Sequence, residues 1–200
     1  MDVIKNMDRL YLSLWLKTPS PLILHERFLT LAQTFPFSVL RPNLIATVRA
    51  ISSTEAPLQE QAVASLAALD TIREVYDAWR ASDTSLELEG YWDLFQSDGL
   101  DWALRPARVH LFAYAAQFDH DEPAPLEGYR REDLRIDFGN ELLFLPATEA
   151  PAHFRMTAQN IRSLLKLVAD LEAALPLERR LLWSESGGNF AERLADLAAE

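Results

Sequence analysis

The sequence predicts an α+β fold, in which a mostly antiparallel or mixed sheet of about six strands carries three to four helices packed mainly on one face. Leucine alternates with other residues from Leu10 to Leu16, which is the period of two expected of a strand. Apolar residues recur at helical spacing from Thr157 to Leu175. Between these segments, several strand-like stretches follow one another without an intervening helix, which favours antiparallel pairing.

A helix is predicted directly after the first strand. Ser20 can cap it, and Pro21 suits the first helical position because its missing N–H would have no partner there. Leu24, Phe28 and Leu31 follow at helical spacing, and Pro36 ends the helix.

The next segments run from a second strand to a second helix. Leu44 to Ile51 is predicted to be a strand. Residues 52–69 fit either a helix or a hairpin whose returning strand is Gln59 to Val63. Asp70 to Ala81 has one apolar stripe and is predicted to be a helix.

The middle of the chain reads as consecutive strands. The predicted strands are Leu86 to Glu89, for which a continuation to Phe95 stays open, Arg108 to Phe118, Leu134 to Phe138 and Leu142 to Leu145. Gly139-Asn140 fits a tight turn between the last two, so they are expected to form a hairpin.

The C-terminal part holds a long helix, an unassigned run and a short helix. Pro176 stops the long helix, Arg179 to Trp183 has no clear type, and Asn189 can cap a terminal helix. The opening β-α-β and closing ββα order resembles a ferredoxin-like topology.

Length and composition indicate a single domain. The 200 residues are predicted to form one α+β domain, with residues 1–6 a disordered extension ahead of Met7. The chain has no cysteine, which excludes disulfides, thiolate metal sites and a cysteine nucleophile. No signal peptide or membrane-spanning run is recognised, so a cytoplasmic location is expected.

Acidic charge is concentrated in the middle of the chain. The net charge is −11, and residues 51–100 hold ten acidic and two basic side chains. Because a phosphate backbone would be repelled, nucleic-acid binding is not expected. A basic partner would be attracted, although solubility alone also accounts for such a charge.

One segment combines this charge with aromatic rings. Residues 81–104 carry six carboxylates and no basic side chain. The candidate binding residues in it are Tyr91, Trp92, Asp93 and Trp102. Three interpretations stay open: the rings stack on a sugar or a cation, they contact a protein partner, or they belong to the core beneath an acidic edge strand.

Catalytic motifs are sparse. No glycine-rich phosphate loop, nucleophile elbow or paired-histidine metal motif is present, and no cofactor is evident. His110 is a candidate general base, and Arg135 and Asp137 share one strand face, where an ordinary ion pair is the alternative.

One loop has the residue types of a divalent-metal site. Asp119, His120 and Asp121 offer oxygen and imidazole ligands, to which Glu87 or Glu89 can contribute, and the alternative is a solvated acidic loop.

The function expected from the sequence is therefore broad. The first hypothesis is a binding or regulatory module that meets a protein partner, or a second copy of itself, through the acidic aromatic segment. The alternative is a small-molecule hydrolase with carboxylate and histidine chemistry. A third hypothesis is an acidic antagonist that imitates nucleic acid.

Overall fold

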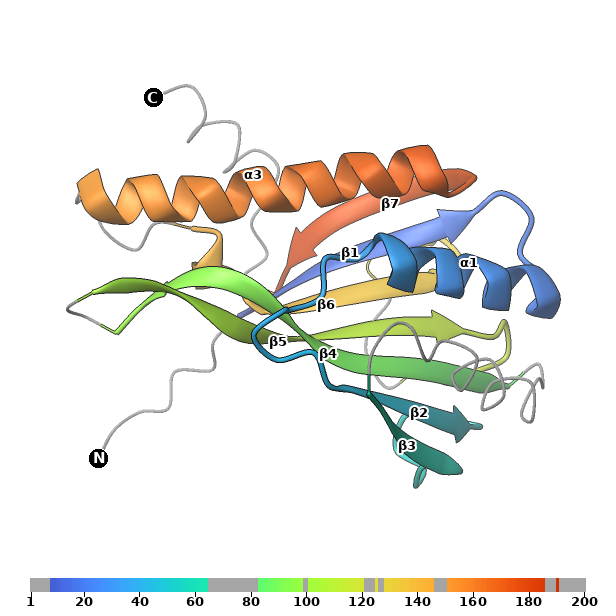
Figure 1. The fold of residues 1–200 in the computed structure, drawn as a ribbon. Coiled ribbons are helices and arrows are strands. Elements are labelled where there is room, and N and C mark those ends of the chain that lie inside the picture. The colour runs from blue at the N-terminus through green and yellow to red at the C-terminus, as the bar shows by residue number, and fades with distance from the viewer. Residues whose placement is uncertain are drawn as a thin grey trace, which may run out of the picture.

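Seven strands form one sheet in the order β3-β2-β4-β5-β6-β1-β7, and every pairing between them is antiparallel (Figure 1). The computed structural model describes residues 8–64, 83–98, 101–120, 125, 128–145, 151–185 and 190. The strands are β1 (Arg9–Leu16), β2 (Leu44–Ala50), β3 (Gln59–Val63), β4 (Thr84–Ser97), β5 (Trp102–Tyr114), β6 (Leu134–Asn140) and β7 (Leu177–Ser184). The helices within these residues are α1 (Pro21–Thr34), the 3₁₀ turn η2 (Glu141–Leu143) and α3 (Pro151–Ala174).

The predicted fold of about six strands and three to four helices is wrong. Within the described residues there are seven strands and two α-helices, both of which lie on the same side of the sheet (Figure 1). The ferredoxin-like topology is also wrong, because β4, β5 and β6 lie between β1 and β2. The helix expected at Asp70 to Ala81, the extension at residues 1–6 and, apart from Phe190, the helix expected after Asn189 fall outside the described residues.

Three local differences account for the change in strand number. Residues 59–63 form the hairpin alternative and pair with β2, and the unassigned run 179–183 lies in β7, which pairs with β1. The strand expected at Leu142 to Leu145 is instead largely the turn η2. Asn140 causes this difference, because its side-chain oxygen accepts a hydrogen bond from the Leu142 N–H at 2.9 Å and caps the turn.

The N-terminal elements form where the sequence predicts them. Leu10 to Leu16 lies in β1, and α1 begins after Ser20, whose hydroxyl accepts a hydrogen bond from the Ile23 N–H at 3.4 Å. Pro21 occupies the first turn of α1, and the helix ends one residue before Phe35.

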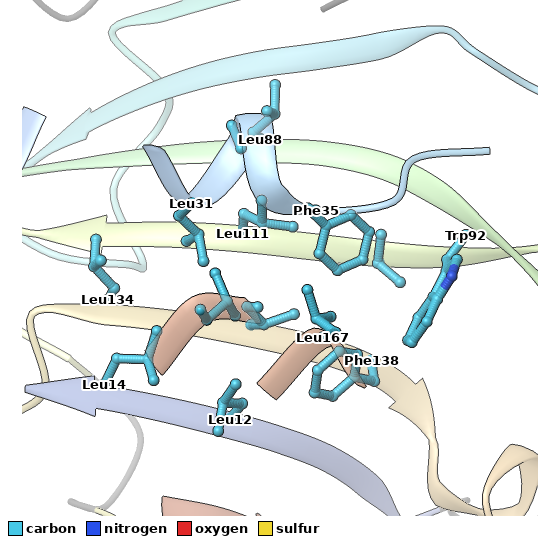
Figure 2. Packing of buried hydrophobic residues seen from close by; sticks show 14 of the residues in the cluster. Leu12, Leu14, Leu31, Phe35, Leu88, Trp92, Leu111, Leu134, Phe138 and Leu167 are labelled. Atoms are coloured by element: carbon cyan, nitrogen blue, oxygen red, sulfur yellow. The ribbon is translucent and has the colours of Figure 1, made fainter. Parts of the chain in front are cut away.

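The core lies between α1, α3 and the face of the sheet beneath them. Leu31 and Phe35, from α1 and its C-terminal cap, and Leu167 of α3 point toward side chains of the central strands, as Figure 2 shows. The strand side chains that meet them include Leu12, Leu14, Leu88, Leu111, Leu134 and Phe138. Full burial of one such side chain stabilises the fold by roughly 1.5–3 kcal/mol, so this two-layer packing supplies most of the driving force for folding.

Residues at alternate positions point to the other side of the sheet. We call this side, opposite α1 and α3, the open face. Among the described residues, no helix has the length and apolar character needed to cross a membrane.

Candidate functional site

Polar and aromatic side chains from four neighbouring strands gather on the open face. In one transverse row of paired residues, Glu89 of β4 lies opposite His110 of β5, His110 opposite Asp137 of β6, and Asp137 opposite Tyr11 of β1. In the next row, Phe112 lies between Glu87 and Arg135. Strand alternation thus directs leucines into the core and these side chains to the opposite face.

A concave region of about 290 Å³ lies over these rows, and we call it the open-face hollow. Its lining comprises Arg9 and Tyr11 of β1, Arg49 of β2, Ser85 and Glu87 of β4, His110, Phe112 and Tyr114 of β5, and Arg135 and Asp137 of β6, together with Ser53, Phe118 and His120. Five strands and two loops therefore contribute to one site.

His110 and Glu87 form a hydrogen-bonded pair in the hollow. The distance between His110 Nδ1 and Glu87 Oε1 is 2.7 Å, and the two side chains are 17% and 19% exposed. In the tautomer that carries its proton on Nδ1, the ring donates to Glu87, and Nε2 is then a proton acceptor. No described residue is hydrogen-bonded to Nε2. This arrangement can support general base chemistry.

Asp137 is the second carboxylate of the site and is nearly buried. Its carboxylate accepts hydrogen bonds from the Gly139 N–H at 2.8 Å and from Arg9 Nε at 3.2 Å, and it forms an ion pair with Arg9. Burial raises the pKa of Asp137, while the Arg9 charge, these hydrogen bonds and His110 oppose that rise without cancelling it. Asp137 therefore holds its charge at a cost in free energy.

Arg135 is an internal cation of the site. Its guanidinium donates from Nε to Glu132 Oε1 at 2.6 Å, and both side chains are almost fully buried. Three rings surround the guanidinium carbon, with centroids 5.5 Å away for Tyr11, 5.7 Å for Tyr114 and 5.8 Å for Trp183. Attraction between the cation and the ring faces fixes the orientation of these rings.

Aromatic rings stack one against the next along β5 and into the loop after it, and we call this series the aromatic ladder (His110, Phe112, Tyr114 and Phe118). Consecutive ring centroids are 6.0, 5.6 and 5.9 Å apart, and the angles between planes are 7°, 9° and 22°. The His120 ring meets Tyr114 edge-on at 4.1 Å. The edges of rings stacked in this way can pack against a planar ligand.

Two loops that border the hollow are tied together at Ile51. This residue has φ of +73°, which is strained for a β-branched side chain. Its carbonyl accepts a hydrogen bond from the Asp119 N–H at 2.8 Å, and Ser53 N donates to the Asp119 carbonyl at 3.2 Å. The strained turn thereby holds Ser53 beside Phe118 and His120 at the rim of the hollow.

The structure brings together the three catalytic candidates of the sequence, because His110, Arg135 and Asp137 all line the open-face hollow. His110 and Asp137 are direct cross-strand partners. Arg135 pairs with Glu132 and not with Asp137, whose cation is Arg9.

The four candidates from the acidic aromatic segment lie elsewhere. Trp92 is 4% exposed and packs among the rings of Phe35, Phe138 and Phe144 in the core. Tyr91 lies beneath Arg41, whose guanidinium carbon is 3.9 Å from the ring centroid. Two further contacts complete this set: Asp93 accepts hydrogen bonds from Ser38 and Val39, and Trp102 pairs with Ser97 at the end of the β4–β5 hairpin.

The metal candidates are only partly described. The main chain of Asp119 bridges to Ser52, His120 lines the hollow, and Asp121 lies outside the described residues. Glu87 is hydrogen-bonded to His110, and Glu89 forms an ion pair with Arg108, in which Glu89 Oε1 lies 3.5 Å from Arg108 Nε. Within the part of the chain that the structure describes, no three histidine or carboxylate side chains are grouped as a metal site.

Sequence reasoning missed the residues that complete the hollow. Arg9, Tyr11 and Arg49 come from strands far from β5 in the sequence, and only the strand order places them beside it. The one available signal was alternation along β5, which puts Phe112 and Tyr114 on the face of His110.

Comparison of the chain with protein-family models, with curated proteins and with solved structures found no match in any of the three.

Proposed function

We propose that this protein binds a small planar organic ligand in the open-face hollow. The observation that carries the proposal is the aromatic ladder running beside the row of polar side chains at His110 and Asp137. Ligand sites typically combine apolar or aromatic walls with a few convergent polar groups in a concave region. The ring of the ligand packs against the edges of Phe112 and Tyr114, and its polar groups face His110 and Glu87.

The size of the hollow favours a small molecule. Its volume of about 290 Å³ is near the lower end of the range for ligand sites, roughly 300–1,000 Å³. A ligand of one or two rings matches this space and the length of the ladder.

The charges around the hollow favour a ligand with an acidic group. Arg9 is neutralised by Asp137, and Arg135 by Glu132. Arg49 donates from Nη1 to the Glu55 carbonyl at 2.9 Å, and no described carboxylate forms an ion pair with it. A ligand carboxylate is therefore best placed at Arg49, on the opposite side of the ladder from Asp137.

A fragment screen tests the proposal. The probes are benzoate, indole-3-carboxylate and nicotinate, with cyclohexanecarboxylate as the matched non-planar control. We expect the planar acids to shift the NMR signals of His110 and Phe112 and the control to shift them less, because a flat aromatic ring makes closer contact with the ring edges of the ladder. Equal shifts for planar and non-planar acids, or shifts confined to residues outside the hollow, would contradict it.

A second candidate function is hydrolysis of a small molecule, and the His110–Glu87 pair is the observation that favours it. His110 Nε2 accepts a proton from a water molecule as the water oxygen bonds to an acyl carbon and the leaving group departs with its electron pair. The proton then passes from the imidazolium to solvent or to the leaving group.

Hydrolysis of p-nitrophenyl acetate checks this second function. We expect His110→Gln to lower the rate by about 10²-fold or more, because general bases commonly contribute that much. His120→Gln is the matched control, since it removes another histidine that lines the same hollow, and it should leave the rate near that of the wild type. Equal rates for the wild type and His110→Gln would exclude this function.

A further inference from the structure

A second cavity, of about 390 Å³, lies between the N-terminal end of α1, the end of β5 and residues 130–133, and we call it the α1 cavity. Its apolar lining includes Pro19, Leu24, Ala115 and Phe118. The α1 cavity and the open-face hollow share Tyr114, Phe118 and His120, and all their other lining residues differ.

Two buried polar atoms belong to side chains that line the α1 cavity. Glu132 Oε2 and Arg131 Nη1 are both shielded from solvent, and neither has a hydrogen-bond partner among the described residues. Leaving one such group unsatisfied costs roughly 1–3 kcal/mol, and most buried polar atoms in proteins are hydrogen-bonded for this reason. The two atoms are therefore an acceptor and a donor without a partner among the described residues, and their side chains line a largely apolar cavity.

Neighbouring contacts hold Glu132 in place. Its other oxygen, Oε1, accepts from Arg135 Nε at 2.6 Å, so turning the carboxylate away would leave a buried cation without its partner. The next residue, Asp133, accepts from the Leu16 N–H at 2.7 Å and from Arg130 Nη1 at 2.9 Å. The unsatisfied oxygen is thus preorganised and not a side chain free to find another partner.

We propose that the α1 cavity is a second binding site, which takes a small, mainly apolar ligand whose polar group is uncharged and carries a hydrogen-bond donor next to an acceptor, such as a primary carboxamide. The amide N–H donates to Glu132 Oε2, and the amide oxygen accepts from Arg131. A carboxylate ligand would be repelled by Glu132, and an amine offers no acceptor of comparable strength to Arg131. The volume matches a molecule of roughly ten non-hydrogen atoms, since a water molecule occupies about 30 Å³ in the liquid.

Benzamide is the probe that tests this site, and toluene and benzoate are its matched comparisons. Binding is followed through the methyl NMR signals of Leu24 and Ala115, which line the α1 cavity and not the open-face hollow. We expect benzamide to shift these signals with higher affinity than either comparison, because only benzamide supplies both the donor and the acceptor. Shifts by toluene at equal affinity, or no shift by benzamide up to its solubility, would overturn the proposal.

Arg131→Met tests the polar contact separately. It should weaken benzamide binding about tenfold, which corresponds to the loss of one hydrogen bond to a charged group. Arg162→Met, which removes an exposed arginine of α3, is the control and should leave the affinity unchanged. Thermal melts establish that both variants fold, and an unchanged affinity in folded Arg131→Met would contradict the assignment. Because these signals report the α1 cavity, the result is independent of whether the open-face hollow binds its own ligand.

Discussion

Several single residues at the site lower the stability of the fold while they hold polar side chains in fixed positions. Asp137 is nearly buried and keeps a partner in Arg9, yet burial still raises its pKa. Glu132 and Arg135 form a pair that is almost fully buried, and such pairs seldom stabilise a fold more than apolar residues of similar volume would. Ile51 adds backbone strain at the rim of the hollow. Costs of this kind are common where side chains are held in place for binding.

Asp137→Asn measures how much the buried charge of Asp137 changes the free energy of unfolding. A raised pKa means that the folded state binds a proton more tightly than the unfolded state, so the free energy of unfolding falls as pH rises above 3.8 and through the folded-state pKa. The amide removes this titration and can still accept from the Gly139 N–H. We expect the two proteins to be similarly stable below pH 3.8, and the variant to be the more stable one at pH 7.

Urea unfolding across this pH range gives the comparison. If the wild type instead gains stability over Asp137→Asn as the pH rises, the ion pair with Arg9 outweighs burial, and the polar row is a stabilising feature.

At the scale of elements, the long β4–β5 hairpin organises both faces of the sheet. Its two strands pair from Ser85–Tyr114 to Ser97–Trp102, and they supply Glu87, His110 and Phe112 to the open face. On the other face, Trp92 packs in the core, and the chain after α1 crosses the hairpin where Phe37 bridges to Trp92. The position of this crossing fixes the hairpin relative to α1.

Gly90 permits this crossing. A Cβ at Gly90 would lie 2.6 Å from Phe37 Cε1 and 2.7 Å from Leu44 Cδ2, both closer than van der Waals contact allows. We expect Gly90→Ala to lower the free energy of unfolding by about 1–3 kcal/mol, the usual cost of overpacking a core. Chemical denaturation checks the value, with Ala103→Gly at the exposed end of the hairpin as a control for altered strand propensity. No loss of stability in Gly90→Ala would mean that the crossing is not tightly packed.

The sequence predicted local elements better than their assembly. Ser20 and Pro21 identified the start of α1, and the leucine alternation identified β1, because these signals depend on near neighbours. The fold class and strand number were wrong, because Arg179 to Trp183 has no clear period, and only pairing with β1 makes it a strand. For the candidate site, His110, Arg135 and Asp137 were named from their strands, whereas Arg9, Glu87 and Arg49 join them through a strand order that the sequence does not encode locally.

At the scale of the whole molecule, the sheet separates two groups of side chains. The side that faces α1 and α3 holds the apolar core, and the open face holds the polar row and the aromatic ladder. Most of the rings in the acidic aromatic segment are buried or covered, so the acidic charge of that segment and the candidate ligand site are separate features of the surface. We propose that the aromatic ladder of the open face is a wall of the ligand site.

The most direct test of this role is the affinity of Phe112→Ala, relative to the wild type, for the planar acid that binds the wild type most tightly. Leu104→Ala, an exposed apolar residue of β5 outside the hollow, is the matched control. Loss of the Phe112 ring should weaken binding about tenfold, or roughly 1.4 kcal/mol, while Leu104→Ala should bind as the wild type does. Equal affinities for Phe112→Ala and the wild type, with both proteins folded, would contradict the account.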